Sequence, residues 1–169
     1  MLKILGCLMM FSGCTALGFI KAETYKLRRV ELGNTLESIR LLQIDMTYKK
    51  ETLQRAFKHL QDVKPCWFSK LLIACSHNLS KSGSVTEAWQ MSLKNSSDSP
   101  LKKEDIVILN DIFTGLGKSD ITGQESIFKP AIFRLEAAYD DALAEEKKQG
   151  RMFKCLGSFA GLAIVILLI

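Results

Sequence analysis

The segment that comes nearest to a catalytic motif is Gly115-Leu-Gly-Lys-Ser119, which ends like a phosphate-binding loop. A complete loop of that kind has another glycine five residues before its final glycine, and Ile112 occupies that position. The loop also follows a strand, whereas the apolar spacing before Gly115 is helical. We therefore interpret the segment as a corner at which one helix ends at a glycine and the next begins at a Ser or Asp.

Four carboxylates near the C-terminal end, Asp140, Asp141, Glu145 and Glu146, have the spacing of one helix surface. Carboxylates that act as a general acid and base need burial or a like-charged neighbour in a cleft, because only such surroundings shift their pKa values far enough. Several lysines lie close by in the sequence, and nothing indicates a cleft. We predict that these carboxylates form a solvated face or a docking patch for a basic partner.

Two histidines and two cysteines in the middle of the chain invite a zinc hypothesis. His59, Cys66, Cys75 and His77 are separated by intervals that fit none of the common zinc-ligand patterns. Neither histidine has a nucleophile and a supporting acid at a recognisable spacing. The sequence therefore predicts a protein that is not an enzyme, with no catalytic residues, no metal site and no cofactor.

The charged residues of this 169-residue chain are absent from both of its ends. No Asp, Glu, Lys or Arg occurs in residues 4–20 or in residues 155–169. Helices of about 15 to 17 residues reach about 22 to 26 Å, close to the thickness of a bilayer core when flanking lysines such as Lys154 extend to the headgroups. We predict an N-terminal transmembrane helix over 1–20, a cytoplasmic helical-bundle domain over 21–153 and a C-terminal transmembrane helix over 154–169.

The formal net charge of +5 comes mostly from basic residues beside the two apolar runs. They are Lys21, Lys26, Arg28, Arg29, Lys147, Lys148, Arg151 and Lys154. Basic residues near membrane ends favour the cytoplasmic side, so both flanks place the middle of the chain in the cytoplasm and the termini outside it. A nucleic-acid-binding protein would instead concentrate its basic residues on one face of a folded element.

Two alternatives stay open at this point. The residues Phe-Ser-Gly-Cys14 form a loose lipoprotein processing site, so the chain could be an envelope lipoprotein adaptor that is anchored at Cys14 with its domain outside the cytoplasm. We favour a retained helix, since the aliphatic residue usual in such a site is replaced by Phe11. A third hypothesis, a nucleotide-hydrolysing protein, depends only on Gly117-Lys-Ser119.

Apolar residues between the two ends recur at three- and four-residue spacing, which indicates amphipathic helices and no convincing strand. The stripe predicted for the first helix includes Leu27, Val30, Leu36, Ile39, Leu42 and Met46. Ser84 and Glu87 have the spacing of a capping box, Trp89 is expected in the core, and Pro130 should bend the last helix or mark its start. The predicted fold is all-α, a six-helix bundle whose first and last helices continue into N- and C-terminal transmembrane spans.

Five short segments share their order and spacing with one protein family. They are MLKILG at the start, the later Cys-Thr-Ala-Leu-Gly-Phe, Glu87-Ala-Trp89, Leu116-Gly-Lys-Ser-Asp120 with Gln124 four residues on, and the ending LGSFAGLAIVILLI. Over its full length the chain resembles the stage III sporulation protein AB family of endospore-forming bacteria.

That resemblance implies a membrane protein of the mother cell, in the membrane that faces the forespore, that is needed for the channel complex joining the two. It implies that the soluble part is similar to the cytoplasmic domain of the type II secretion inner-membrane protein F, and that this part contacts the secretion-type ATPase of the complex. The family-marker positions, which carry no catalytic role and are possible interaction sites, are Ala88, Trp89, Leu116, Gly117, Ser119, Asp120 and Gln124.

Gly157 and Gly161 are four residues apart in the C-terminal apolar run. Small residues at this spacing let two membrane helices approach closely. We predict that this face of the last helix packs against the first span or against a neighbouring helix.

Overall fold

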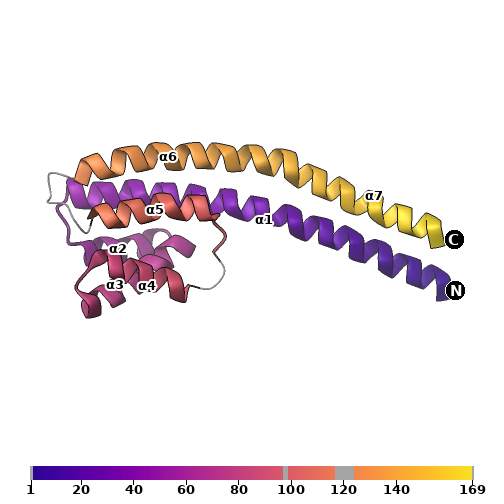
Figure 1. The fold of residues 1–169 in the computed structure, drawn as a ribbon, viewed down its shortest axis with the longest axis horizontal. Helices are drawn as coiled ribbons and strands as arrows, with labels where there is room; N and C mark the ends of the chain where they lie inside the picture. The colour runs from indigo at the N-terminus through magenta and orange to yellow at the C-terminus, as the bar shows by residue number, and fades with distance from the viewer. Residues whose placement is uncertain (1, 97–98, 117–123, 169) are drawn as a thin grey trace. The chain divides into compact units, whose positions relative to one another are not determined.

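The computed structural model describes residues 2–96, 99–116 and 124–168, and all regular structure in these ranges is helical (Figure 1). The elements are α1 (Leu2–Thr47), α2 (Leu53–Val63), α3 (Trp67–Ser82), α4 (Val85–Asn95), α5 (Lys103–Leu116), α6 (Gln124–Glu145), η2 (Glu146–Gly150) and α7 (Arg151–Leu168). Because α6, η2 and α7 follow one another directly, they form one helix with a π-helical segment, η2, inside it. The predicted all-α fold with six helices is confirmed for the described ranges.

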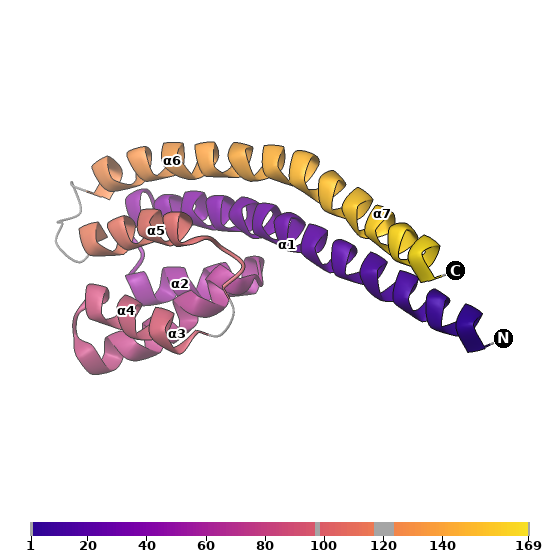
Figure 2. The same ribbon diagram turned by 45° about the vertical axis from the view of Figure 1, so that its right-hand side comes forward.

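The chain divides by its internal contacts into two compact units. One unit, here called the helix pair, consists of Met1–Arg29 and Asp140–Ile169; the other, here called the bundle, is Val30–Tyr139. Within the helix pair, Figure 2 shows α7 beside the first part of α1, and α7 ends where α1 begins. The two segments of the helix pair are therefore antiparallel.

Four aromatic side chains from four different helices meet in the centre of the bundle. Phe57, Phe68, Trp89 and Phe113 come from α2, α3, α4 and α5, and each is at most 1% exposed. The Trp89 ring stacks on the Phe113 ring with centroids 3.9 Å apart, and Phe57 and Phe68 lie 6.1 and 6.4 Å from Phe113. Buried aromatic contacts of this kind contribute about 0.5–1.5 kcal/mol per pair beyond the burial of their area. The predicted core position of Trp89 is confirmed.

The stripe predicted on α1 is correct in its second half and wrong in its first. Leu36, Ile39, Leu42 and Met46 are buried, together with Leu32. In contrast, Leu27 and Val30 are 53% and 39% exposed, and the inward positions are held by Arg28 and Glu31. These polar side chains have partners: a carboxylate oxygen of Glu31 accepts a hydrogen bond from the Phe68 N–H at 3.0 Å. Apolar spacing cannot reveal a buried charge whose partner is distant in the sequence.

A capping box occurs in the bundle, but at a different helix from the one predicted. At the start of α3, Ser69 Oγ accepts from the Cys66 N–H at 2.8 Å, and the Ser69 N–H donates to Cys66 Sγ at 3.4 Å. At the start of α4, the Ser84 side chain makes no capping hydrogen bond, so the predicted box at Ser84 and Glu87 is wrong. Glu87 is exposed, and water can satisfy the free N–H groups there.

Pro130 lies inside α6, because the helix begins six residues earlier at Gln124. The alternative prediction, in which Pro130 marks the start of the helix, is therefore wrong. Proline lacks the N–H that would bond to the preceding turn, so an interior position is tolerated at the loss of one backbone hydrogen bond.

The described residues include no helix with both the length and the apolar character that crossing a membrane requires. The membrane continuation of the first and last helices stays a prediction from the sequence.

Candidate functional site

Two of the family-marker positions lie on α4 and are enclosed by the bundle. Ala88 and Trp89 are 0% and 1% exposed. The Trp89 indole N–H donates to Asn110 Oδ1 at 2.6 Å, so the one polar group of this side chain is satisfied within the fold. These two residues therefore hold α4 against α5 and offer no surface to a partner.

The other marker positions surround the corner between α5 and α6. Leu116 is the last residue of α5 and is 8% exposed. Gly117, Ser119 and Asp120 lie outside the described residues, as does the side chain of Gln124, the first residue of α6. The element before the corner is a helix, as predicted, and a phosphate-binding loop would follow a strand.

Close packing explains the first glycine of the segment that resembles a phosphate-binding loop. A Cβ atom added to Gly115 would lie 3.1 Å from three side-chain atoms of Ile127 on α6. Gly115 thus lets α5 and α6 approach, which is a structural reason for a glycine at this position.

Within the helix pair, glycines bring the two backbones into direct contact. A Cβ atom at Gly18 would lie 2.7 Å from the Phe153 carbonyl oxygen, and one at Gly157 would lie 3.0 Å from both the Cys14 carbonyl oxygen and Gly18 Cα. A Cβ atom at Gly161 would lie 2.9 Å from the Phe11 ring. The structure therefore places Gly157 and Gly161 of α7 against α1, and Gly18, one of several small residues in the first apolar run, is the matching glycine on α1.

Ion pairs join the same two segments of the helix pair ten residues farther along α1. Arg28 donates to Glu145 Oε2 at 2.7 Å with an Arg28 side chain only 8% exposed, and Arg29 donates to Glu146. The prediction of one solvated acidic face is therefore wrong for Glu145 and Glu146, because α1 supplies a guanidinium to each. A guanidinium can bind a carboxylate through two N–H groups at once. An ion pair made by a largely buried Arg such as Arg28 is therefore geometrically more specific than an exposed one.

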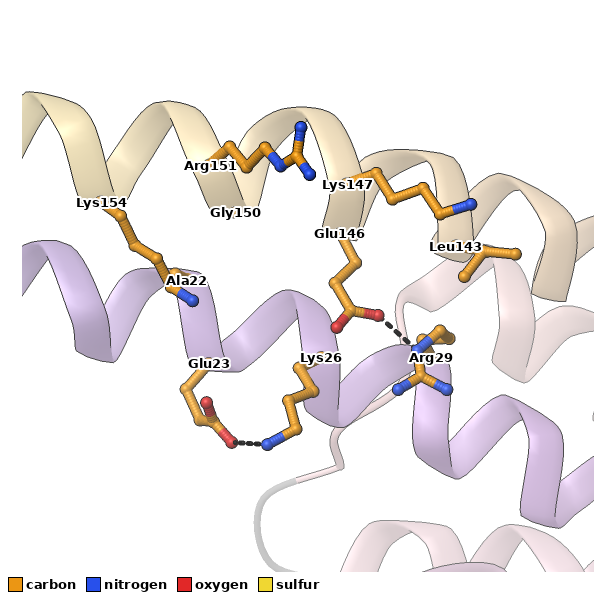
Figure 3. Close-up of a pocket in the computed structure, with 10 residues that line it drawn as sticks. All are labelled: Ala22, Glu23, Lys26, Arg29, Leu143, Glu146, Lys147, Gly150, Arg151 and Lys154. Atoms are coloured by element: carbon orange, nitrogen blue, oxygen red, sulfur yellow. Dashed lines mark hydrogen bonds and ion pairs between the residues drawn. The ribbon is translucent and has the colours of Figure 1, made fainter.

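A pocket of about 360 Å³ lies between α1 and the π-helical segment of the helix pair (Figure 3). We call it the basic pocket, since its charged lining residues are Lys26, Arg29, Lys147, Arg151, Lys154, Glu23 and Glu146. Figure 3 shows Glu146 reaching from η2 to Arg29 and Lys154 reaching toward Ala22. Five basic and two acidic side chains give the pocket an excess of three positive charges.

A second polar cluster closes the end of α1 in the bundle. The Asp45 side chain is 3% exposed, and its two oxygens lie 2.7 Å from Lys49 Nζ and from His59 Nδ1. Burial alone would raise the pKa of Asp45, but hydrogen bonds and charge from Lys49 and His59 outweigh it and hold the pKa below its ordinary value. Asp45 is thus an acidic partner of His59 that the sequence did not reveal.

The cysteines and histidines of the zinc hypothesis do not converge. In the described ranges, no three His, Cys, Asp or Glu side chains gather in a way that could hold a metal ion. Cys66 caps α3, and Cys75 is fully buried, where desolvation raises the pKa of its thiol to about 12. The two thiols therefore have structural roles, Cys66 as a helix cap and Cys75 as a buried core residue.

One signal in the sequence could have indicated the basic pocket. Arg28-Arg29 and Glu145-Glu146 are doublets of opposite charge, each beside an apolar run at one end of the chain. Two antiparallel helices would bring such doublets together, which is the arrangement observed. The π-helical segment has no comparable signature apart from Gly150 at its end.

These features define a protein that is all-helical in its described ranges, in which the marker residues Ala88, Trp89 and Leu116 are buried and a basic pocket lies on a pair of antiparallel helices. Residues 3–169 match the family described as Stage III sporulation protein AB. The chain is 32% identical over 170 residues to stage III sporulation protein AB of Bacillus subtilis (strain 168), with 99% of each chain covered. A solved structure titled Stage III sporulation protein AB is similar with a TM-score of 0.64 at 26% identity, covering 72% of this chain and 98% of that one. The chain belongs to the stage III sporulation protein AB family, as the sequence segments indicated.

Replacement of Gly157 tests the glycine contact. Gly157→Ile should separate α7 from α1, because the added side chain meets backbone atoms that cannot move aside, at a cost of about 1–3 kcal/mol. The measurement is the yield of a short bismaleimide crosslink between Tyr25→Cys and Phe153→Cys, whose native rings stack 5.9 Å apart, in a chain freed of its own cysteines. We expect the yield to fall several-fold.

The matched control is Gly13→Ile, since a Cβ atom at Gly13 meets nothing within 4 Å. It should leave the crosslink yield unchanged. Equal yields from the two isoleucine variants would show that the glycine contact does not hold the helices together.

The lowered pKa of Asp45 predicts a pH-dependent contribution to stability. Because the pKa in the folded state lies below the ordinary 3.8, the stabilisation is present above that value and is lost as the pH falls through the folded-state pKa. Asp45→Asn should therefore lower the free energy of unfolding by about 1–3 kcal/mol at about pH 7, with the difference from the parent chain shrinking below about pH 4. Urea unfolding followed by circular dichroism measures this free energy.

A difference between the two chains that stays constant down to about pH 2.5 would contradict a lowered pKa of Asp45. The control is Asp140→Asn, which changes an exposed residue and should have little effect at either pH.

Proposed function

We propose that this sporulation protein is a non-enzymatic membrane component of the channel complex between mother cell and forespore. Its two apolar ends anchor it in the mother-cell membrane that faces the forespore. Its bundle lies in the cytoplasm and contacts the secretion-type ATPase of that complex. Membership of the stage III sporulation protein AB family supports the role in sporulation.

The observation that carries the membrane part of the proposal is the exposed apolar surface of the helix pair. In the described part of its two uncharged runs, nine large apolar side chains are between 49% and 73% exposed: Met9, Met10, Leu17, Phe19, Ile20, Leu156, Phe159, Leu162 and Ile166. Soluble monomers seldom expose so many large apolar side chains together, and a bilayer or a protein partner normally covers such a surface. The two uncharged runs continue beyond it, to Ile4 at one end and to Ile169 at the other.

The charges that border this surface support the orientation. Lys21 follows the apolar run of α1, and Lys148, Arg151 and Lys154 precede that of α7. All four are exposed, so they can meet the phosphates of one membrane face. The residues of the bundle come between these two basic flanks in the sequence, so in this proposal they lie on the same side of the membrane as the flanks. The positive-inside rule identifies that side as the cytoplasm.

The proposed contact with an ATPase rests on the resemblance described above. The interior of the bundle offers no reactive site at two of its polar pairs, because Asn78 donates to Ser92 at 2.8 Å and Trp89 donates to Asn110. A protein of this design acts through its surface, with the buried aromatic cluster keeping that surface rigid.

The lipoprotein alternative agrees less well with the helix pair. Processing at Cys14 would remove the segment that contains Phe11, whose ring packs on Gly161. The mass of the membrane-extracted protein separates the two hypotheses, because only the lipoprotein loses residues 1–13.

Co-purification tests the proposed partner. The full chain, tagged and extracted in mild detergent, should retain the secretion-type ATPase of its complex when the two are co-expressed, and should show no nucleotide hydrolysis of its own. Gly157→Ile serves as the matched variant: it should keep the ATPase, because the bundle is intact, but support fewer spores in a strain that lacks the native protein. Failure of the folded parent chain to retain the ATPase would contradict the partner assignment.

A further inference from the structure

Two of the five cations in the basic pocket are already neutralised. Lys26 pairs with Glu23 at 3.0 Å on α1, and Arg29 pairs with Glu146 across the helix pair. No ion pair in the described ranges involves Lys147, Arg151 or Lys154. The pocket therefore keeps three cationic side chains available for an anion.

The pocket is also hollow at its helical wall. Gly150 is buried, yet a Cβ atom added to it would meet no heavy atom within 4 Å. A buried residue with open space in front of it lines a cavity. Gly150 closes the π-helical segment, and Lys147 and Arg151 stand on either side of it in the sequence. Such segments are rare and occur frequently at functional sites.

An apolar groove adjoins the basic pocket through a shared residue. This second hollow of about 300 Å³ is lined by Phe19, Lys154, Cys155, Ser158, Phe159 and Leu162. The Lys154 ammonium lies 5.4 Å from the centre of the Phe19 ring, so this lysine stands at the boundary between the charged and the apolar hollow. A charged cavity and an apolar groove that share a lining residue fit a ligand with a charged head and a hydrocarbon tail.

We propose that the basic pocket between α1 and η2 binds the phosphate of an anionic phospholipid, with one acyl chain in the groove beside Phe159. The inference rests on the membrane placement proposed above. Basic pockets between membrane helices on the cytoplasmic side commonly take anionic headgroups. The phosphate chemistry is shared by soluble phosphates, and the apolar groove favours the lipid.

Lipid retention by the full chain in detergent, counted by native mass spectrometry after addition of phosphatidylglycerol, tests the site. The Lys147→Gln/Arg151→Gln variant should retain phosphatidylglycerol about 25-fold more weakly, since each cation contributes about a factor of five. Gly150→Met, which fills the hollow without a change in charge, should weaken retention by about tenfold. Neither change removes a member of the ion pairs Lys26–Glu23, Arg28–Glu145 and Arg29–Glu146.

The matched control is Lys21→Gln/Lys148→Gln, which removes two exposed lysines from the same flanks but none from the pocket. This double variant should weaken phosphatidylglycerol retention by at most about twofold. Lysines outside the pocket attract anionic lipids mainly through a charged bilayer surface, and a neutral detergent micelle has no such surface. Equal losses in the two double variants, or full retention in Gly150→Met, would overturn the proposal. If inorganic phosphate binds and displaces phosphatidylglycerol, the ligand of the pocket is a soluble phosphate and the assignment of a lipid is overturned.

Flotation with phosphatidylcholine vesicles separates this proposal from the proposed function. A chain that floats with neutral vesicles but shows no specific retention of phosphatidylglycerol is a membrane protein without the lipid site. A chain that fails to float contradicts the membrane placement itself.

Discussion

The structure of the helix pair depends on the contact between Gly18 and Gly157, where two backbones meet without side chains between them. Arg28 lies ten residues from Gly18 along α1, whereas its partner Glu145 lies twelve residues from Gly157. If both segments were regular α-helices, the number of residues between the glycine contact and the ion pair would be the same on each. Because a π-helix holds more residues per turn than an α-helix, η2 takes up part of this difference and lets the glycine contact and the ion pairs coexist. The basic pocket lies where the helix is widened.

The helix pair has an apolar surface at one end and charged side chains at the other. Toward the chain ends the exposed side chains include Leu17 and Ile166, whereas farther along each segment they include Lys21, Lys148 and Arg151. The proposed membrane would accommodate both halves. α1 is one unbroken helix from Leu2 to Thr47, so it belongs to both units. The same helix therefore contributes Gly18 to the helix pair and Ile39 to the bundle.

Most of the fold follows from local patterns in the sequence. Three- and four-residue apolar spacing predicted the helices, and Trp89 was correctly expected in the core. The errors on α1 occur where a partner distant in the sequence decides the outcome. Arg28 and Glu31 displace Leu27 and Val30 from the interior because each finds a partner on another helix. Asp45 and His59 are a further example. The π-helical segment depends on matching two helices over their length, which no single stretch of sequence encodes.

The central claim is that the two ends of the chain enter a membrane with the bundle on the cytoplasmic side. The most direct measurement is labelling by a membrane-impermeant maleimide in intact, non-sporulating cells that express chains with single cysteines. Tyr48→Cys, which replaces a 75% exposed bundle residue, should react only after the cells are permeabilised, whereas Lys3→Cys should react in intact cells. Labelling of Tyr48→Cys in intact cells would contradict the account.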